Sequence, residues 1–176
     1  GSSTMNPMVH EITVRGQGQY AFGDRLTPLS MSAMGGYYTV RGYPQSIVAG
    51  DNSVQGTVEY RLHLPRTFEP QPVGKGLFDD DFRWAPDAAT GALPDWDLAL
   101  LGFFDIARVW QSDRQAFEKD TTLMGAGVGV ELAFRQNFKF TVNYGWALKE
   151  VTTVGQQGAR VDSGNGQFYF LGSLSF

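Results

Sequence analysis

Arg41 is the residue whose neighbours most clearly indicate a chemical role. It lies between glycines in the stretch MGGYYTVRGYPQ, which spans 34–45. Gly35 and Gly36 before it and Gly42 after it let the chain bend, because glycine adopts backbone conformations that other residues avoid. A guanidinium presents a planar fork of donors that can bind both oxygens of one carboxylate. An arginine in this setting is therefore suited to hold an acidic side chain from elsewhere in the chain.

Catalytic and metal-binding chemistry has little support in the sequence. Cysteine is absent, and His10 and His63 lie far apart without the spacing of metal ligands. Ser30 and Ser32 have no histidine near them in sequence, and no G-x-S-x-G motif occurs. The net charge of −4 and the pI of 5.1 do not suggest a nucleic-acid partner. We therefore expect neither an enzyme nor a bound cofactor or metal.

Alternation of apolar and polar residues dominates the chain and predicts strands with one apolar face. Six such segments are predicted, at 11–22, 54–64, 97–110, 124–135, 138–148 and 167–176. In the second, Val58, Tyr60 and Leu62 alternate with Thr57, Glu59 and Arg61. The 22 glycines disfavour helix, since each costs about 1 kcal/mol in a helix interior relative to alanine. No apolar run reaches the roughly 18 residues of a transmembrane helix.

The predicted strands are long, and their polar faces carry charged and amide side chains. About eleven tilted residues rise roughly 25 Å, the height of the apolar band of an outer-membrane barrel. Aromatic residues gather toward strand ends, as interfacial girdles do; these are Tyr20, Phe22, Phe134, Phe138, Trp146, Phe168 and Phe176. Alternation alone leaves two interpretations open, a soluble half-buried sheet and a membrane barrel with a wet lumen.

Three long connections separate the predicted strands, at 23–53, 65–95 and 151–166. Connections of this length are uncommon in compact soluble domains. The middle one holds five prolines and the acidic run Asp79–Asp81, so we expect a solvated, flexible spacer there.

Two motifs carry a resemblance to a known family. The stretch GGYYTVRGYPQ resembles the V-R-G-Y/F loop motif of the outer-membrane superfamily that contains the BamA and TamA assembly proteins and the two-partner secretion transporters FhaC and ShlB. The stretch FFDIA at 103–107 resembles the F-x-D-x-G strand motif of that superfamily, with Ala107 where glycine is usual. Both motifs occur in the family's order along the chain, and the resemblance covers essentially all 176 residues.

The resemblance implies that the loop folds into the barrel and that Arg41 meets Asp105 on the inner wall. Asp105 falls on the lumen parity of its strand, together with Phe103. A buried carboxylate needs a partner, since an unpaired buried charge is costly. We refer to this expected contact as the loop–wall lock and assign it the following residues: Arg41, Gly42, Tyr43, Phe103 and Asp105.

Further candidates share the expected lumen face or the chain end. Glu59 and Arg61 are candidate partners of the lock, or else hydrated lumen charges with no specific role. Gly125, Gly127 and Gly129 leave a strip of bare backbone, against which the loop tip can lie or which merely relieves curvature. The terminal Phe176 resembles the end of an assembly signal of the family.

The fold that we expect is all-β, with residues 1–176 forming about six strands of a larger, sixteen-stranded transmembrane barrel and a long loop in its lumen. Six strands are too few to close around a filled lumen, so an N-terminal part with earlier strands and periplasmic modules is expected. The expected location is the bacterial outer membrane, with lipid and an unfolded polypeptide substrate as partners.

The resemblance implies passage or insertion of polypeptides, and YYTVRGY followed by VEYRLHLPR favours a two-partner-secretion-type transporter. Three alternatives stay open: an assembly insertase of the BamA/TamA type, a barrel that anchors a passenger domain, and a soluble β-rich binding module. The number of periplasmic modules would separate the transporter from the insertase, and a requirement for detergent would separate a barrel from a soluble module.

Overall fold

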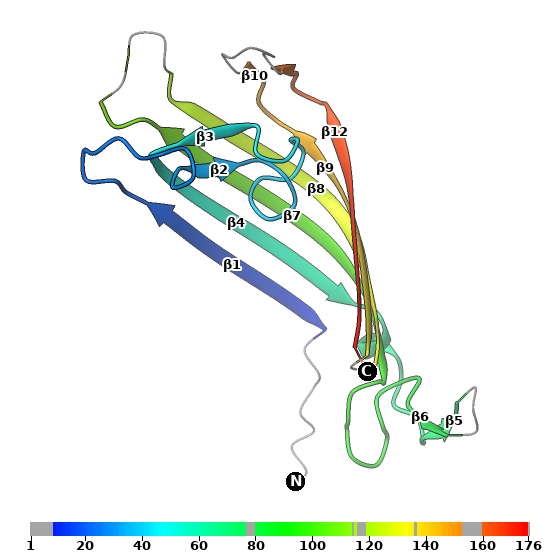
Figure 1. The fold of residues 1–176 in the computed structure, drawn as a ribbon. Helices are drawn as coiled ribbons and strands as arrows, with labels where there is room; N and C mark the ends of the chain where they lie inside the picture. Colours follow the sequence, from blue (N-terminus) through cyan, green and yellow to red (C-terminus); the bar gives the residue numbers. More distant parts are fainter. Residues whose placement is uncertain are drawn as a thin grey trace.

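The computed structural model describes residues 9–76, 80–113, 115, 119–135, 137–152 and 160–175, which form an all-β fold (Figure 1). The elements are β1 (His10–Gln19), β2 (Ser32–Met34), β3 (Val48–Gly50), β4 (Asn52–His63), the 3₁₀ turn η1 (Pro65–Thr67), β5 (Gly74–Lys75), β6 (Asp81–Phe82), β7 (Trp96–Trp110), β8 (Thr121–Phe134), β9 (Phe138–Ala147), β10 (Val151–Thr152), β11 (Arg160–Val161) and β12 (Gly166–Leu174). Within these ranges, no helix has the length and apolar character needed to cross a membrane.

The long strands form one antiparallel six-stranded sheet in the order β1-β4-β7-β8-β9-β12. The prediction of an all-β fold with six long strands is confirmed. Their ends differ from the prediction most clearly at the first strand, which stops at Gln19. Phe22 lies beyond it in a left-handed turn (φ 52°), and the amide of Ala21 donates to the side chain of Asn52, so the chain turns toward the loop. Tyr20 and Phe22 therefore do not extend the apolar face of β1.

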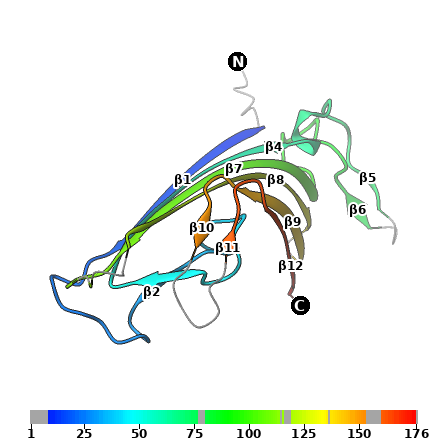
Figure 2. The same cartoon turned by 90° about the horizontal axis from the view of Figure 1, so that it is seen from above.

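The sheet is strongly curved, and its two faces differ in chemistry (Figure 2). On the concave face of β7, every second residue from Ala99 to Val109 is buried. Leu100, Phe104 and Ile106 alternate with them and stay exposed on the convex face. The same alternation continues in β8, where Val128 is 54% exposed. The convex face is thus a continuous apolar surface, whereas the concave face carries the polar side chains of β1, β4 and β9.

The segment 23–53 folds over the concave face as a hairpin (Figures 1 and 2). β2 and β3 pair antiparallel, with Met34 opposite Val48, and the residues between them form the tip. The tip packs on the concave face of the sheet through apolar residues from both sides, which are Met34, Val40, Tyr43, Ala107, Val109, Leu123, Ala147, Val151 and Val161. This small core fixes the loop at one end of the sheet, because burying these side chains removes apolar area from water.

Asp51 joins the ends of two loops at the same end of the sheet. Its side chain is fully buried and accepts hydrogen bonds from the amides of Leu26 (2.9 Å) and Ser112 (2.9 Å). Asn52, the next residue, donates to the Ser112 hydroxyl at 3.0 Å. Backbone amides that would otherwise lose their hydrogen bonds on burial are satisfied in this way.

The Pro-rich segment 65–95 is folded over its described residues, so the expectation of a flexible spacer is wrong there. β5 and β6 pair, Gln71 bridges to Asp87, and the backbone and guanidinium of Arg83 donate to Asp95. Phe82 is 2% exposed and stacks on Phe134 at the end of β8. The apolar anchor explains the difference, because proline content alone does not indicate whether a segment has a surface to pack on.

Several predicted features lie outside the described residues. These include Phe176 with its expected assembly role, Asp79 of the acidic run, and the central part of the connection 151–166.

Replacing Phe82 with alanine should release the 65–95 segment from the sheet. A buried phenylalanine contributes about 3–5 kcal/mol relative to alanine, and this segment has few other buried side chains. We expect limited proteolysis within 65–95 to become faster in F82A. V73A, which truncates a side chain that is 44% exposed, is the matched control. Equal cleavage of F82A and the parent would show that the segment does not depend on this anchor.

Candidate functional site

Arg41 is delivered to the concave face by the tip of the β2–β3 hairpin. Bonds within the tip hold its shape: the Gly35 amide donates to the Thr39 hydroxyl at 2.8 Å, and the Gly36 amide donates to the Val40 carbonyl at 3.1 Å. Gly42 follows Arg41 with φ 100°, a left-handed conformation that a side chain would strain. The shape of the tip is therefore defined in part by its own hydrogen bonds.

The structure brings Arg41 and Asp105 together as a forked pair. The Arg41 Nε atom donates to Asp105 Oδ2 at 2.7 Å, and Nη2 donates to Oδ1 at 2.9 Å. The backbone amide of Arg41 adds a third bond to Oδ2 at 3.1 Å. Because both the side chain and the main chain of one residue bind the same carboxylate, the position of the loop backbone is fixed together with the guanidinium.

Glu59 and Phe103 complete the surroundings of the guanidinium. Nη1 of Arg41 donates to Glu59 Oε2 at 2.8 Å, so Glu59 is a direct partner of the arginine. The guanidinium carbon lies 3.4 Å from the centre of the Phe103 ring, a stacked cation–π contact that is worth about 2 kcal/mol when water is excluded. The register explains the geometry, since Glu59 lies opposite Phe103 and Asp105 follows two residues along β7.

All three charged side chains of this site are buried, so each depends on the others to offset the loss of water. Arg41 is 5% exposed, Glu59 2% and Asp105 1%. Burial alone would lower the pKa of Arg41, but hydrogen bonds and attraction from Asp105 and Glu59 outweigh it and raise the pKa above its ordinary value. The stabilisation from this arginine is thus fully present below the unfolded-state pKa and is lost only as the pH rises through the higher folded-state pKa. The guanidinium stays charged at any physiological pH.

Tyr43 and Tyr169 fix the residues that follow Arg41. The Tyr43 hydroxyl donates to the carbonyl of Lys149 at 2.7 Å and also lies 3.0 Å from the carbonyl of Met124. Tyr169 of β12 accepts a bond from the Gly42 amide (3.0 Å), and its hydroxyl donates to the Tyr43 carbonyl (2.8 Å). Every residue predicted for the loop–wall lock, Gly42 and Tyr43 included, thus lies in one connected site.

The glycine strip on β8 contacts the loop at one position only. A Cβ on Gly125 would overlap the carbonyl oxygen of Arg41, so the bare backbone there gives room for the tip. Gly127 is instead covered by the Phe103 ring, and Gly129 by the side chain of Asn143. Gly145 on β9, which was not predicted, is the second loop contact, since a Cβ there would lie 2.8 Å from the Gly42 nitrogen.

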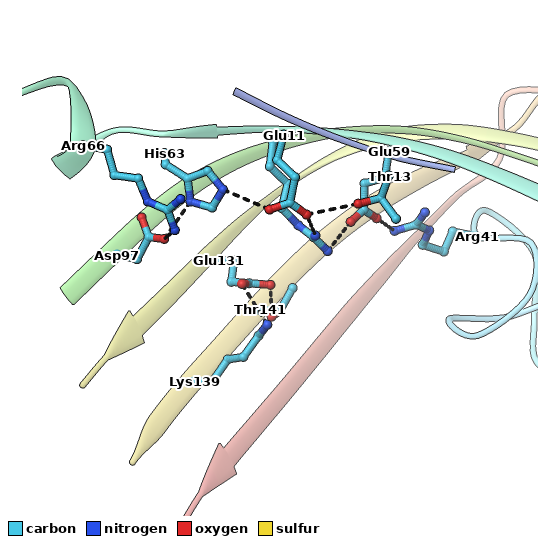
Figure 3. A network of polar contacts seen from close by, with 11 residues as sticks. Glu11, Thr13, Arg41, Glu59, His63, Arg66, Asp97, Glu131, Lys139 and Thr141 are labelled. Carbon is cyan, nitrogen blue, oxygen red and sulfur yellow. Dashed lines mark hydrogen bonds and ion pairs between the residues drawn. The ribbon is translucent and has the colours of Figure 1, made fainter. Parts of the chain in front are cut away.

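Arg61 belongs to a longer series of charged side chains that crosses the concave face from the loop to η1 (Figure 3). We call this series the charged row; in spatial order it consists of Arg41, Glu59, Arg61, Glu11, His63, Asp97 and Arg66. Arg61 pairs with Glu59 and, at 2.8 Å, with Glu11. Arg61 therefore shares its charge between two carboxylates, which lowers the cost of keeping Glu59 buried.

The remote half of the charged row was not predicted. His63 lies 3.4 Å from Glu11 and 2.6 Å from Asp97, and Asp97 also accepts a bond from Arg66 at 2.9 Å. The alternation in the sequence does put Glu11 and His63 on the polar faces of their strands, but their contact depends on the register between β1 and β4. The pairing of Asp97 with Arg66 gives no sequence signal, because it depends on the turn that η1 makes after β4.

A cavity of about 690 Å³ lies on the concave face beside the lock. Its polar lining includes Arg15, Gln55, Glu131, Lys139 and Asn143. Lys139 pairs with Glu131 at 2.8 Å across β8 and β9. Among the residues that the structure describes, no three histidine or acidic side chains are grouped to hold a metal ion. The arrangement is suited to hydrogen bonding and to holding the loop.

Comparison with models of known protein families, with curated proteins and with solved structures gives no match for this chain. The functional argument therefore depends on the chemistry of the two sheet faces and on the geometry of the lock.

A methyl group at position 125 should push the loop tip off the wall. In G125A the new Cβ meets the carbonyl of Arg41, a contact with main chain that cannot rotate away. We expect amide hydrogen exchange in the 35–47 tip to become faster, because displacement breaks the Arg41 bonds to Asp105. G102A is the matched control, since no atom lies within 4 Å of a Cβ at this exposed-face glycine of β7. Unchanged exchange in G125A would contradict the tight packing described above.

Proposed function

We propose that this chain forms part of the wall of an outer-membrane β-barrel that transports polypeptides, of the type found in the two-partner secretion branch of the BamA/TamA superfamily. The observation that carries the proposal is a forked, buried Arg41–Asp105 pair that holds a loop against the concave face of a sheet whose convex face is apolar. In that superfamily, the corresponding loop arginine and strand aspartate meet inside the barrel.

The two faces of the sheet support a membrane setting. The six strands of the sheet are 9 to 15 residues long, and a tilted membrane strand needs about 9–11. Ile12 and Val14 at one edge are each 71% exposed, and Phe170 at the other is 79% exposed. Large apolar side chains over a whole sheet face would favour aggregation in water, whereas lipid is a suitable solvent for them.

The open edges support a larger barrel. β1 and β12 each have a strand partner on one side only within the described chain, because the sheet order starts and ends with them. Unpaired backbone groups at a sheet edge are not tolerated in hydrocarbon. Further strands, contributed by an N-terminal part of the same protein, would pair with both edges and enclose the concave face as a lumen.

In this lumen, the loop acts as a removable plug and the charged row acts as a polar wall. A polypeptide that crosses in an unfolded state needs hydrogen-bond partners for its own backbone, and the Arg, Glu, Lys and Asn side chains around the cavity offer them. Movement of the loop would require Arg41 to leave Asp105 and Glu59, so the lock sets the free energy of opening.

The membrane setting is tested by placing an arginine on each face of the sheet. In V128R the new charge is on the convex face near the middle of β8, where a lipid contact makes it cost about 2–4 kcal/mol. In Q55R the charge lines the concave cavity and should be tolerated. We expect V128R to reduce the amount of heat-modifiable barrel in outer membranes and Q55R to leave it unchanged. Equal tolerance of both variants would indicate a water-exposed convex face.

The transport function is tested by removing the arginine of the lock. Full-length R41A should insert in the membrane in normal amounts but secrete its partner polypeptide poorly, because the loop no longer returns to one position. R15A removes an arginine from the same cavity without touching the lock and is the matched control. Normal secretion by R41A would contradict a role of the lock in transport, while normal secretion with failing assembly of other barrels would favour an insertase.

A further inference from the structure

The 65–95 segment ends in a cluster of aromatic rings that joins it to the sheet. The cluster consists of Phe68, Phe82, Trp84, Trp96 and Phe134. The rings contact one another in series, and the Phe82 ring lies between those of Phe134 and Trp84, with ring centres 5.3 Å and 4.8 Å away. Trp84 is 5.9 Å from Trp96, which in turn is 6.3 Å from Phe68. The indole nitrogen of Trp96 donates to the Trp84 carbonyl at 3.0 Å, which fixes both residues.

The aromatic cluster lies on the convex side of the sheet. Trp96 is the first residue of β7 and Phe134 the last residue of β8, and both share the parity of the exposed residues Leu100 and Val128 of their strands. Figure 2 shows β5 and β6 outside the arc drawn by the six strands, on the side opposite the loop. The 65–95 segment therefore extends the apolar convex face at the end of the strands and does not cover the lumen.

The rings of the aromatic cluster differ in how much of their surface is exposed. Phe82 is buried, whereas Trp84 is 53% exposed and Phe134 45%. Arg135 lies beside the rings, with its guanidinium carbon 5.7 Å from the centre of Phe82, and it pairs with Asp80. The cluster thus presents aromatic surface on one side and charged groups next to it.

This combination fits the boundary between hydrocarbon and lipid headgroups. Tryptophan and other aromatic residues concentrate there, because their rings are apolar while their edges hydrogen-bond, and arginine extends its charge into the headgroups. In the described parts of this segment, 65–76 and 80–95, regular structure is limited to η1, β5 and β6, and lipid does not tolerate exposed irregular backbone, so the segment belongs outside the hydrocarbon. A position at the ends of β7 and β8 satisfies both conditions.

We propose that the described parts of this segment, 65–76 and 80–95, bind the phospholipid surface of the membrane, with Trp84 and Phe68 at the level between headgroups and acyl chains. This inference rests on the proposed barrel, since it takes the convex face to be in lipid. As the connection between β4 and β7, the segment then fixes how deep the ends of these strands lie in the bilayer. Phe82 holds the segment on the sheet by packing on Phe134.

The test places a photoreactive benzophenone amino acid in the full-length protein, one position at a time, and identifies what it captures in outer membranes. In place of Trp84 it should form an adduct with phospholipid. In place of Val128 it reports whether the convex face is in lipid at all, and in place of Gln55 it should capture no lipid, because that residue lines the concave cavity. In vesicles of phosphatidylethanolamine and phosphatidylglycerol that contain brominated lipid, W84F should lose the fluorescence component that bromines near the headgroup quench most.

Each outcome has one meaning. Lipid captured at 128 and at 84 supports the anchor. Lipid captured at 128, with a protein or nothing captured at 84, overturns the anchor and leaves the barrel in place. Absence of lipid at 128 overturns the barrel proposal and the anchor with it. Quenching in W84F equal to that of the parent also overturns the anchor, since Trp84 would then contribute nothing at headgroup depth.

Discussion

A guanidinium that is held away from water must be matched by negative charge, and this constraint determines how the loop and the sheet fit together. Arg41 is fixed by Asp105 and Glu59, two carboxylates on neighbouring strands, and by the ring of Phe103, which lies opposite Glu59 in the register of β4 and β7. A carboxylate without its arginine would be costly in the same place. The site is therefore stable only when the loop tip and both strands are present together.

The surrounding residues follow from the close approach that the ion pair requires. The carbonyl of Arg41 occupies the space that a side chain at position 125 would need, and the Gly42 backbone does the same at 145. Glu59 is shared with Arg61, so the neutralisation of Arg41 continues along the charged row to Arg66, at the start of the 65–95 segment. The loop and that segment are consequently connected by one continuous series of polar contacts, although they lie at opposite ends of the strands (Figure 1).

The sequence allowed the main elements to be predicted because period-two alternation is local and strong in all six long strands. It also placed Asp105 on the correct face, since parity within a strand decides the face. The contacts of Glu11, Asp97 and Asp51 were beyond reach, because each depends on register or on loop closure between distant segments. The folding of 65–95 was missed for a related reason: its anchor, Phe82, is recognisable only once Phe134 is known to lie beside it.

On the proposed transport function, a loop held by ion pairs is easier to release into water than a loop held by apolar contacts. Separating a buried pair costs about 3–5 kcal/mol when one partner remains stranded, but a loop that moves into a wet lumen rehydrates its own arginine. Glu59 keeps Arg61 as a partner, which leaves Asp105 as the one carboxylate whose loss of Arg41 must be compensated by water or by the passing chain. A substrate that offers backbone amides to Asp105 would lower that cost, so occupancy of the lumen would itself favour the open loop.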